Sequence, residues 1–325
     1  MSSGKHWATI TEAGTLLGMR ILIFAYRIGG NCLLKIFLAP VIGFYFIFHP
    51  AARKASQEFL VRARQQGADI PVPRWWHSLA HLWQFGIAIV DKFAVWMERI
   101  TLQDLTISGS EIIEDLLENK QGAVILISHL GNFEICQCFS KRHEAIRISA
   151  FHHTKNSEKF HAFLKQFNQK NQVEILQVTE IDTETAIRLS EKVSHGEFIV
   201  IAGDRIPVAN KNGTFPIEFM GAPAPFPKGP FALATALKAP VLFLTCIKKG
   251  SGFHVTFEQL SIPQSTGRKS HRQKIERLAA SYASRLQYHC LQSPFQWFNF
   301  YSFWQDTEQF TTQTSNSTSV TGRHN

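Results

Sequence analysis

Two side chains that can perform acid–base chemistry, those of His129 and Glu134, follow an apolar run in the segment GAVILISHLGNFEIC. The run itself, residues 123–127, predicts a strand that is buried on both faces. Gly131 permits a tight turn after the strand, and Asn132 is a preferred N-cap for a helix that would contain Glu134. A histidine in the turn and a carboxylate in the first helical turn can face each other across such a corner.

This pair of side chains suits the activation of a hydroxyl group. A neutral imidazole can take a proton at physiological pH, and a neighbouring carboxylate fixes its tautomer and stabilises the imidazolium. The helix N-terminus and the amides of the turn are expected to offer donors for an oxyanion. The corner has no nucleophile in the setting of a serine hydrolase, so direct transfer to the activated hydroxyl is the simpler scheme.

The spacing of a histidine five residues before a glutamate is weak evidence by itself, because chance predicts about one match in a chain of this composition. The sequence has three such matches: His129 with Glu134, His153 with Glu158, and His271 with Glu276. The strand-turn-helix context favours the first of them. His153 follows the apolar run 146–151 and is predicted to bind substrate, with a solvated loop histidine as the alternative. His271 opens a basic amphipathic helix and is predicted to be solvated.

The chain beyond residue 120 alternates short apolar runs with helical patterns, which indicates an α/β fold. The predicted strands are 123–127, 146–151, 173–178, 198–202 and 241–247. The predicted helices between them are 132–141, 157–170, 183–195 and 229–238. We expect a largely parallel or mixed central sheet with helices on both faces, and a ligand site at the carboxyl ends of its strands.

The N-terminal residues 1–50 are predicted to be a helical, membrane-associated segment. Residues 32–48 are apolar and at the lower limit of length for a span, and an amphipathic stretch precedes them. A buried helical hairpin is the alternative. Residues 51–306 are predicted to form the catalytic domain, and the polar tail 307–325 is predicted to be disordered.

The net charge of +9 and the pI near 9.4 indicate an anionic partner. Nucleic acid is disfavoured because the basic residues are dispersed and the aromatic residues lie in core-like helical patterns. The five cysteines stand mostly in apolar runs, at spacings that fit neither disulfides nor zinc. We therefore expect no metal, and an acidic protein or an anionic membrane as the partner.

Four blocks in this chain resemble, in order, those of the lysophospholipid and lipid A acyltransferase superfamily. They are SHLGNFE at 128–134, VIAGDRIP at 200–207, FPIEFMGAPAPFPKGPFALA at 215–234 and SPFQWFNFYSFW at 293–304. The resemblance is to the late lipid A acyltransferases, within a less characterised branch of predicted acyltransferases. Phe133 stands where that family usually has Trp, and Arg205 where Gln is frequent, so the resemblance bears on the chemistry more than on the acceptor.

The resemblance implies an acyltransferase of lipid biosynthesis at the cytoplasmic face of a bacterial inner membrane. His129 would be the general base on an acceptor hydroxyl, and Glu134 its supporting carboxylate. An acyl thioester of acyl-carrier protein or coenzyme A would be the donor, a lipid or glycolipid the acceptor, and no further cofactor would be needed. Thioester hydrolysis and a non-enzymatic peripheral membrane role are the alternatives.

Further residues of these blocks are predicted to bind substrate. Gly131 and Asn132 lie in the first block. Asp204 and Arg205, at a strand exit, would organise the acceptor or the phosphate of the donor's phosphopantetheine, with an internal ion pair as the alternative. Lys228 and Gly229 precede a proline and predict a helix start that accepts an anion, with a plain helix cap as the alternative.

Overall fold

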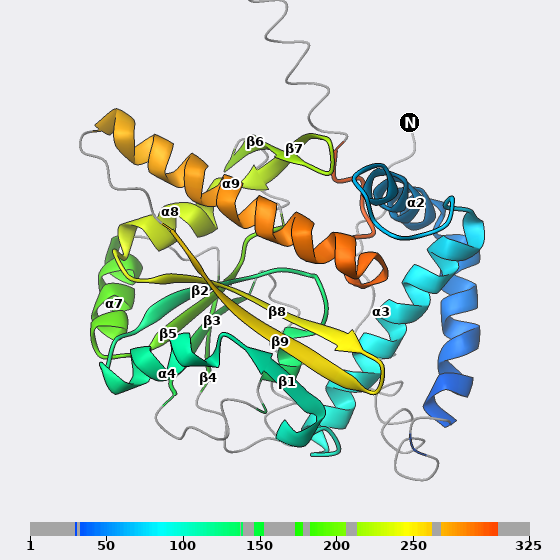
Figure 1. Ribbon diagram of the computed structural model, residues 1–325, viewed down its shortest axis with the longest axis horizontal. Helices are drawn as coiled ribbons and strands as arrows, with labels where there is room; N and C mark the ends of the chain where they lie inside the picture. The colour runs from blue at the N-terminus through cyan, green and yellow to red at the C-terminus, as the bar shows by residue number, and fades with distance from the viewer. Residues whose placement is uncertain are drawn as a thin grey trace, which may run out of the picture.

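The computed structural model describes residues 30, 33–136, 138, 146–152, 173–177, 183–205, 213–261 and 268–304. A seven-stranded mixed sheet forms the centre of this part of the chain, with helices on both faces (Figure 1). Its strands are β1 (Leu105–Ser108), β2 (Ala123–Ile127), β3 (Ile148–His152), β4 (Val173–Gln177), β5 (Phe198–Ala202), β8 (Val241–Lys249) and β9 (Gly252–Leu260). The predicted α/β class is confirmed.

The order of the strands is β1-β9-β8-β2-β5-β3-β4. Five neighbouring strands, from β8 to β4, run parallel to one another, whereas β8 and β9 form an antiparallel hairpin. Since β2 lies between β5 and β8, the chain segments that leave these three strands meet at one edge of the sheet.

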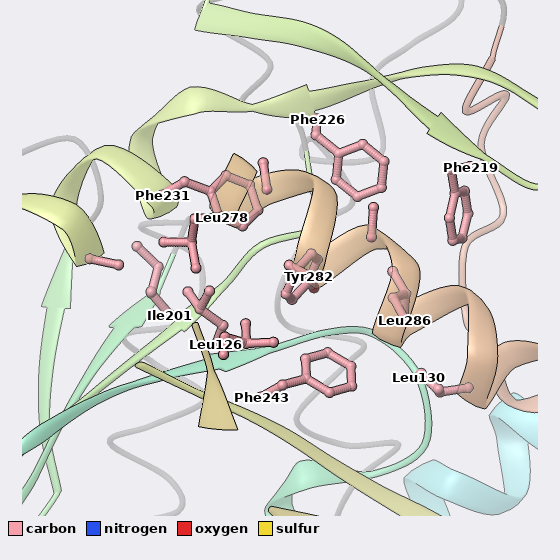
Figure 2. Packing of buried hydrophobic residues seen from close by; sticks show 14 of the residues in the cluster. Leu126, Leu130, Ile201, Phe219, Phe226, Phe231, Phe243, Leu278, Tyr282 and Leu286 are labelled. Carbon is pink, nitrogen blue, oxygen red and sulfur yellow. The ribbon is translucent and has the colours of Figure 1, made fainter. Parts of the chain in front are cut away.

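One face of the sheet is covered by the C-terminal helix α9 (Arg268–Gln292), by α7 (Thr183–Ser194) and by α8 (Lys228–Ala236). Leu278, Tyr282 and Leu286 of α9 recur every four residues, so they lie on one side of the helix. All three are fully buried, and Figure 2 shows them in the cluster with Leu126 and Phe243 of the sheet.

The opposite face of the sheet packs against α4 (Ser110–Glu118). Ile113 and Leu116 of α4 cluster with Ala123, Ile125 and Ile127 of β2, whereas the alternate β2 residues belong to the α9 side. This alternation places all five residues of β2 in one core or the other, as the predicted doubly buried strand requires.

Two long helices, α2 (Pro50–Gln65) and α3 (Trp75–Trp96), precede the sheet and pack against each other. A further apolar helix, Leu33–Phe48, lies beside α3 through Leu34, Leu38 and Ile42 (Figure 1). The chain turns by 92° between this helix and α2. In the described residues no individual helix has the length and apolarity of a membrane span, although the bent pair Leu33–Phe48 and Pro50–Gln65 meets that criterion by length and composition.

A small hairpin, β6 (Thr214–Phe219) and β7 (Ala222–Pro227), completes the described elements over the α9 face. Its two-residue turn, Met220 and Gly221, has positive φ at both positions, as a tight hairpin turn requires. The described residues end in the segment Ser293 to Trp304, which returns to the carboxyl ends of β2 and β8.

The predicted strands agree with β2, β3, β4, β5 and β8 to within about two residues, and α7 and α8 lie where helices were expected. Where an α-helix was predicted over 132–141, the described residues begin with a 3₁₀ turn, η3 (Phe133–Cys136). The predicted helix 157–170, the residues 1–29 and the tail 307–325 lie outside the described residues. β1, β9 and the β6–β7 hairpin were not predicted.

Candidate active site

The imidazole of His129 is paired with the carboxylate of Asp204 at the edge of the sheet. His129 Nδ1 lies 2.8 Å from Asp204 Oδ1, and the backbone N–H of His129 donates to Asp204 Oδ2 at 2.8 Å. The His129 side chain is 32% exposed, whereas that of Asp204 is 1% exposed. The site therefore combines a solvent-accessible imidazole with a buried carboxylate behind it.

The register of two neighbouring strands brings this pair together. Ile127 of β2 is the partner of Ala202 of β5, and the two strands are parallel. His129 and Asp204 each lie two residues beyond this last pair, so they leave the sheet side by side. The location agrees with the expectation of a site at the carboxyl ends of the strands.

The buried carboxylate of Asp204 remains in its ionised form. Burial raises the pKa of Asp204, but the His129 ring, the His129 backbone amide and the Trp297 indole more than offset this effect, so the pKa lies below its ordinary value. An ionised carboxylate only accepts hydrogen bonds, so His129 Nδ1 must carry the hydrogen that faces it. In the neutral imidazole this leaves Nε2 with the lone pair that can take a proton.

The turn after β2 is fixed by hydrogen bonds of its backbone amides to groups within the protein. Besides the His129 amide, the N–H of Leu130 donates to Ser128 Oγ, that of Gly131 to the Gln296 carbonyl, and that of Asn132 to the Cys246 carbonyl. The expectation that the amides of this turn serve an oxyanion is therefore wrong for residues 129 to 132. These amides hold the corner in shape instead.

Gly131 is required by the backbone at this position. Its φ is +72°, and a Cβ atom added there would lie 2.0 Å from the Cys246 carbonyl oxygen. Gly131 forms an isolated bridge with Cys246, which ties the turn after β2 to β8. Substrate binding by Gly131 stays a prediction, and the structure gives the residue a conformational role.

Glu134, the predicted partner of His129, lies in η3 and accepts a hydrogen bond from Lys92 Nζ of α3 at 3.4 Å. Its side chain is 14% exposed. Asn132 is buried and donates from Nδ2 to the Ala88 carbonyl of α3. In the described part of the chain, Asn132 Oδ1 has no hydrogen-bond partner. Both residues thus link the corner to α3.

The remaining predicted residues lie in different settings. Arg205 follows Asp204 and is exposed. Lys228 and Gly229 are also exposed, and they lie in the first turn of α8, which confirms the predicted helix start. His153 lies outside the described residues. His271 is exposed on α9, and its neighbour Arg272 is paired with Glu276, in agreement with a solvated helix face.

Metal ligands do not gather in the described residues, where no group of three or more His, Cys, Asp or Glu side chains is placed to hold an ion. Cys138, Cys246 and Cys290 are buried, and Cys136 is partly buried.

The roles of two contributors to this corner were not predicted from the sequence. Asp204 was predicted to contact substrate, and the structure makes it the carboxylate partner of His129. Trp297 was noted only as part of a block, yet its indole N–H donates to Asp204 Oδ2 at 3.0 Å. A signal for Asp204 was present, because adjacent parallel strands would place the residues two positions after 127 and 202 side by side.

The family model described as "Bacterial lipid A biosynthesis acyltransferase" matches residues 72–306 of the chain. The match covers α3, the whole sheet and the segment that carries Trp297. No curated protein matches the chain.

Proposed function

We propose, from the premise that this chain belongs to the bacterial lipid A biosynthesis acyltransferase family, that it transfers a fatty acyl chain from an acyl thioester to a lipid hydroxyl group. The acceptor is a membrane lipid or glycolipid, and the donor is a thioester of acyl-carrier protein or coenzyme A. The observation that carries the proposal is the accessible imidazole of His129, held at Nδ1 by the buried carboxylate of Asp204.

The proposed reaction needs one base and no covalent intermediate on the protein. His129 Nε2 takes the proton of the acceptor hydroxyl while its oxygen attacks the thioester carbonyl carbon. The tetrahedral intermediate then breaks its C–S bond, and the leaving thiolate takes the proton from the imidazolium. The products are an ester and a free thiol, and His129 returns to its neutral form.

Asp204 serves this reaction as the carboxylate that fixes the tautomer of His129. The imidazolium that forms during proton transfer lies against an ionised carboxylate, which lowers the energy of the charged state. Glu134 remains a second proposed catalytic residue. Its pairing with Lys92 favours a role in holding the wall of the site. The turnover of Glu134→Gln, compared with that of Asp204→Asn, shows which of the two carboxylates supports His129.

We further propose that the N-terminal helices hold the enzyme at the cytoplasmic face of the inner membrane, as members of this family are typically membrane-associated. Exposed apolar side chains cover the outer side of the helix Leu33–Phe48: Ile36, Phe37, Val41, Phe44, Ile47 and Phe48. Trp75 and Trp76, exposed at the start of α3, extend this surface, and Phe46 contacts Trp75. Tryptophans beside an apolar face suit the boundary between headgroups and acyl chains.

The membrane proposal is tested by sedimentation of the full chain with vesicles that contain anionic phospholipid. The double variant Phe44→Ser with Phe48→Ser should shift the protein to the supernatant, because it removes two exposed rings from the apolar face. Ile187→Ser, at an exposed position on α7, is the matched control and should sediment as wild type does. Equal sedimentation of all three proteins would contradict the proposal.

The reaction class is tested by product analysis with dodecanoyl thioesters of acyl-carrier protein and of coenzyme A. Each donor is incubated with the enzyme, with and without lipids extracted from bacterial membranes, and the released thiol and the lipid products are measured. Thiol release that requires lipid and yields a lipid heavier by one acyl group supports transfer. Release of free fatty acid at the same rate without lipid would instead identify a thioester hydrolase.

A further inference from the structure

Trp297 is held at the carboxylate of the proposed base pair by its indole nitrogen. Trp297 Nε1 donates to Asp204 Oδ2 at 3.0 Å, and the same oxygen accepts the backbone N–H of His129 at 2.8 Å. The other oxygen, Oδ1, accepts from the His129 ring. Within the described residues, the indole is therefore the side-chain donor that holds this carboxylate together with the base itself.

The backbone on both sides of Trp297 is bonded to the turn that carries His129. Gly131 N–H donates to the Gln296 carbonyl at 2.8 Å, and Phe298 N–H donates to the His129 carbonyl at 2.9 Å. The Gln296 side chain in turn bonds both the N–H and the carbonyl of Lys248, each at 2.9 Å. The position of Trp297 is thus coupled directly to that of the base.

His81 of α3 holds the carbonyl group of Trp297. His81 Nε2 lies 2.9 Å from the Trp297 oxygen, and Ser56 Oγ of α2 lies 3.0 Å from His81 Nδ1. His81 is fully buried, which lowers its pKa to about 4 despite the bond to Trp297, so the imidazole is neutral. Since a carbonyl only accepts, Nε2 carries the hydrogen, and Nδ1 accepts from the Ser56 hydroxyl.

Aromatic packing restricts the indole further. Trp297 is fully buried, and its ring centroid lies 4.7 Å from that of Phe59, 5.3 Å from Phe219 and 5.2 Å from Phe303. A ring enclosed on several sides and bonded at its nitrogen keeps a single orientation. This fixed donor aims at Asp204 before any substrate binds.

We propose that Trp297 is a positioning residue for the base, acting through Asp204, and that His81 with Ser56 keeps Trp297 in place. The inference rests on the proposed role of His129 in acyl transfer. It predicts that the donor on the indole, and not the bulk of the ring, sets the acid–base behaviour of His129. A purely structural Trp297 would affect stability alone.

The described groups buried around Asp204, apart from His129, are neutral, whereas Arg205, the next residue in the chain, is exposed to solvent. Tyr282 and Cys290 of α9 are buried, and burial raises the pKa of both well above their ordinary values. Tyr301 lies at the backbone carbonyl of Asp204, and His81 is neutral as described. The negative charge of Asp204 is therefore dispersed by the hydrogen bonds from His129 and Trp297.

The test replaces Trp297 by Phe, which keeps an aromatic ring and removes the N–H. Trp304→Phe is the matched control, because its indole is also buried and donates to the Phe219 carbonyl. The full chain is labelled with ¹⁵N-histidine, the ring signals of His129 are assigned with His129→Gln, and their pH midpoint is measured. Turnover of dodecanoyl-coenzyme A with extracted lipids is followed over the same pH range.

Trp297→Phe should move the His129 midpoint and the acid limb of the turnover profile to higher pH. The reason is that a carboxylate with one donor fewer holds the imidazolium more tightly. Turnover should also fall by about ten- to a hundredfold, because the carboxylate loses the donor that holds it, and with it His129, in the reactive orientation. Trp304→Phe should leave both midpoints unchanged. An unchanged or lowered His129 midpoint in Trp297→Phe would overturn the inference.

A second pair of variants keeps the inference testable if Trp297→Phe fails to fold. His81→Gln retains a side-chain N–H for the Trp297 carbonyl, whereas His81→Leu does not. The pH midpoint of His129 should differ from that of the wild type in His81→Leu and should be close to it in His81→Gln. Equal midpoints for the two variants would exclude His81 from the positioning role. If no acyl transfer is detected while the midpoint still moves in Trp297→Phe, the proposed function fails and the coupling of Trp297 to His129 stands.

Discussion

His81 should make the protein lose stability between pH 7 and pH 5. Its pKa is lowered from the ordinary 6.5 to about 4 in the folded protein, because the imidazole is fully buried. The unfolded chain therefore binds a proton in this range that the folded chain does not bind. The contribution is fully present above about pH 6.5, and it is lost as the pH falls toward 4.

The magnitude follows from the size of the shift. One pKa unit corresponds to about 1.4 kcal/mol, so a shift from 6.5 to about 4 limits the loss to about 3 kcal/mol at low pH. Between pH 7 and pH 5 the same two values give a loss of about 2 kcal/mol. Other groups titrate in this range as well, so the test compares a variant with the wild type.

His81→Gln removes the titrating group and keeps a hydrogen-bond donor for Trp297. The free energy of unfolding is measured with urea at pH 7 and pH 5, by tryptophan fluorescence. The variant should lose about 2 kcal/mol less than the wild type between these pH values. His271→Gln, at an exposed position, should lose as much as the wild type. The same pH dependence in wild type and His81→Gln would refute the placement of a neutral, buried His81.

Three further results are expected. Asp204→Asn should lower thiol release by about 10² to 10⁴, because it removes the carboxylate that orients His129, and its circular dichroism spectrum should be unchanged. A folded variant with normal turnover would argue against that role. Lys248→Met should lower the free energy of unfolding in urea by about 2 to 3 kcal/mol, because it leaves the buried Asp91 without its ion-pair partner. A variant as stable as the wild type would contradict this role of the ion pair. Gly131→Ala should lower the melting temperature and turnover together, since its φ is +72° and its Cβ would meet a carbonyl oxygen; wild-type values for both would mean the turn is misplaced.

The strands β2 and β5 could be predicted because all of their residues are apolar. β2 and β5 agree with the runs 123–127 and 198–202, since a strand buried on both faces has no polar position to interrupt the pattern. β9 was missed because it alternates buried and half-exposed residues around His254 and Thr256, and so lacks such a run. A parallel or mixed sheet was expected, but the position of its antiparallel β8–β9 hairpin followed from no apolar run.

The carboxylate of the site could not be assigned from spacing along the chain. Glu134 is five residues from His129, and the local pattern therefore favoured it, whereas Asp204 reaches His129 only through the pairing of β2 with β5. Trp297 is still more distant, because the segment that carries it returns from the end of α9. Contacts of this kind depend on strand order, and strand order is a property of the whole sheet.

The turnover of His129→Gln decides whether His129 is the base of an acyl transfer. Wild type, His129→Gln and the exposed control His271→Gln are compared for folding by circular dichroism, and then for acylated lipid formed from a saturating dodecanoyl thioester. His129→Gln should fold and have a turnover lower by about 10² to 10⁴, whereas His271→Gln should be close to wild type. A folded His129→Gln protein with near-normal turnover would contradict it.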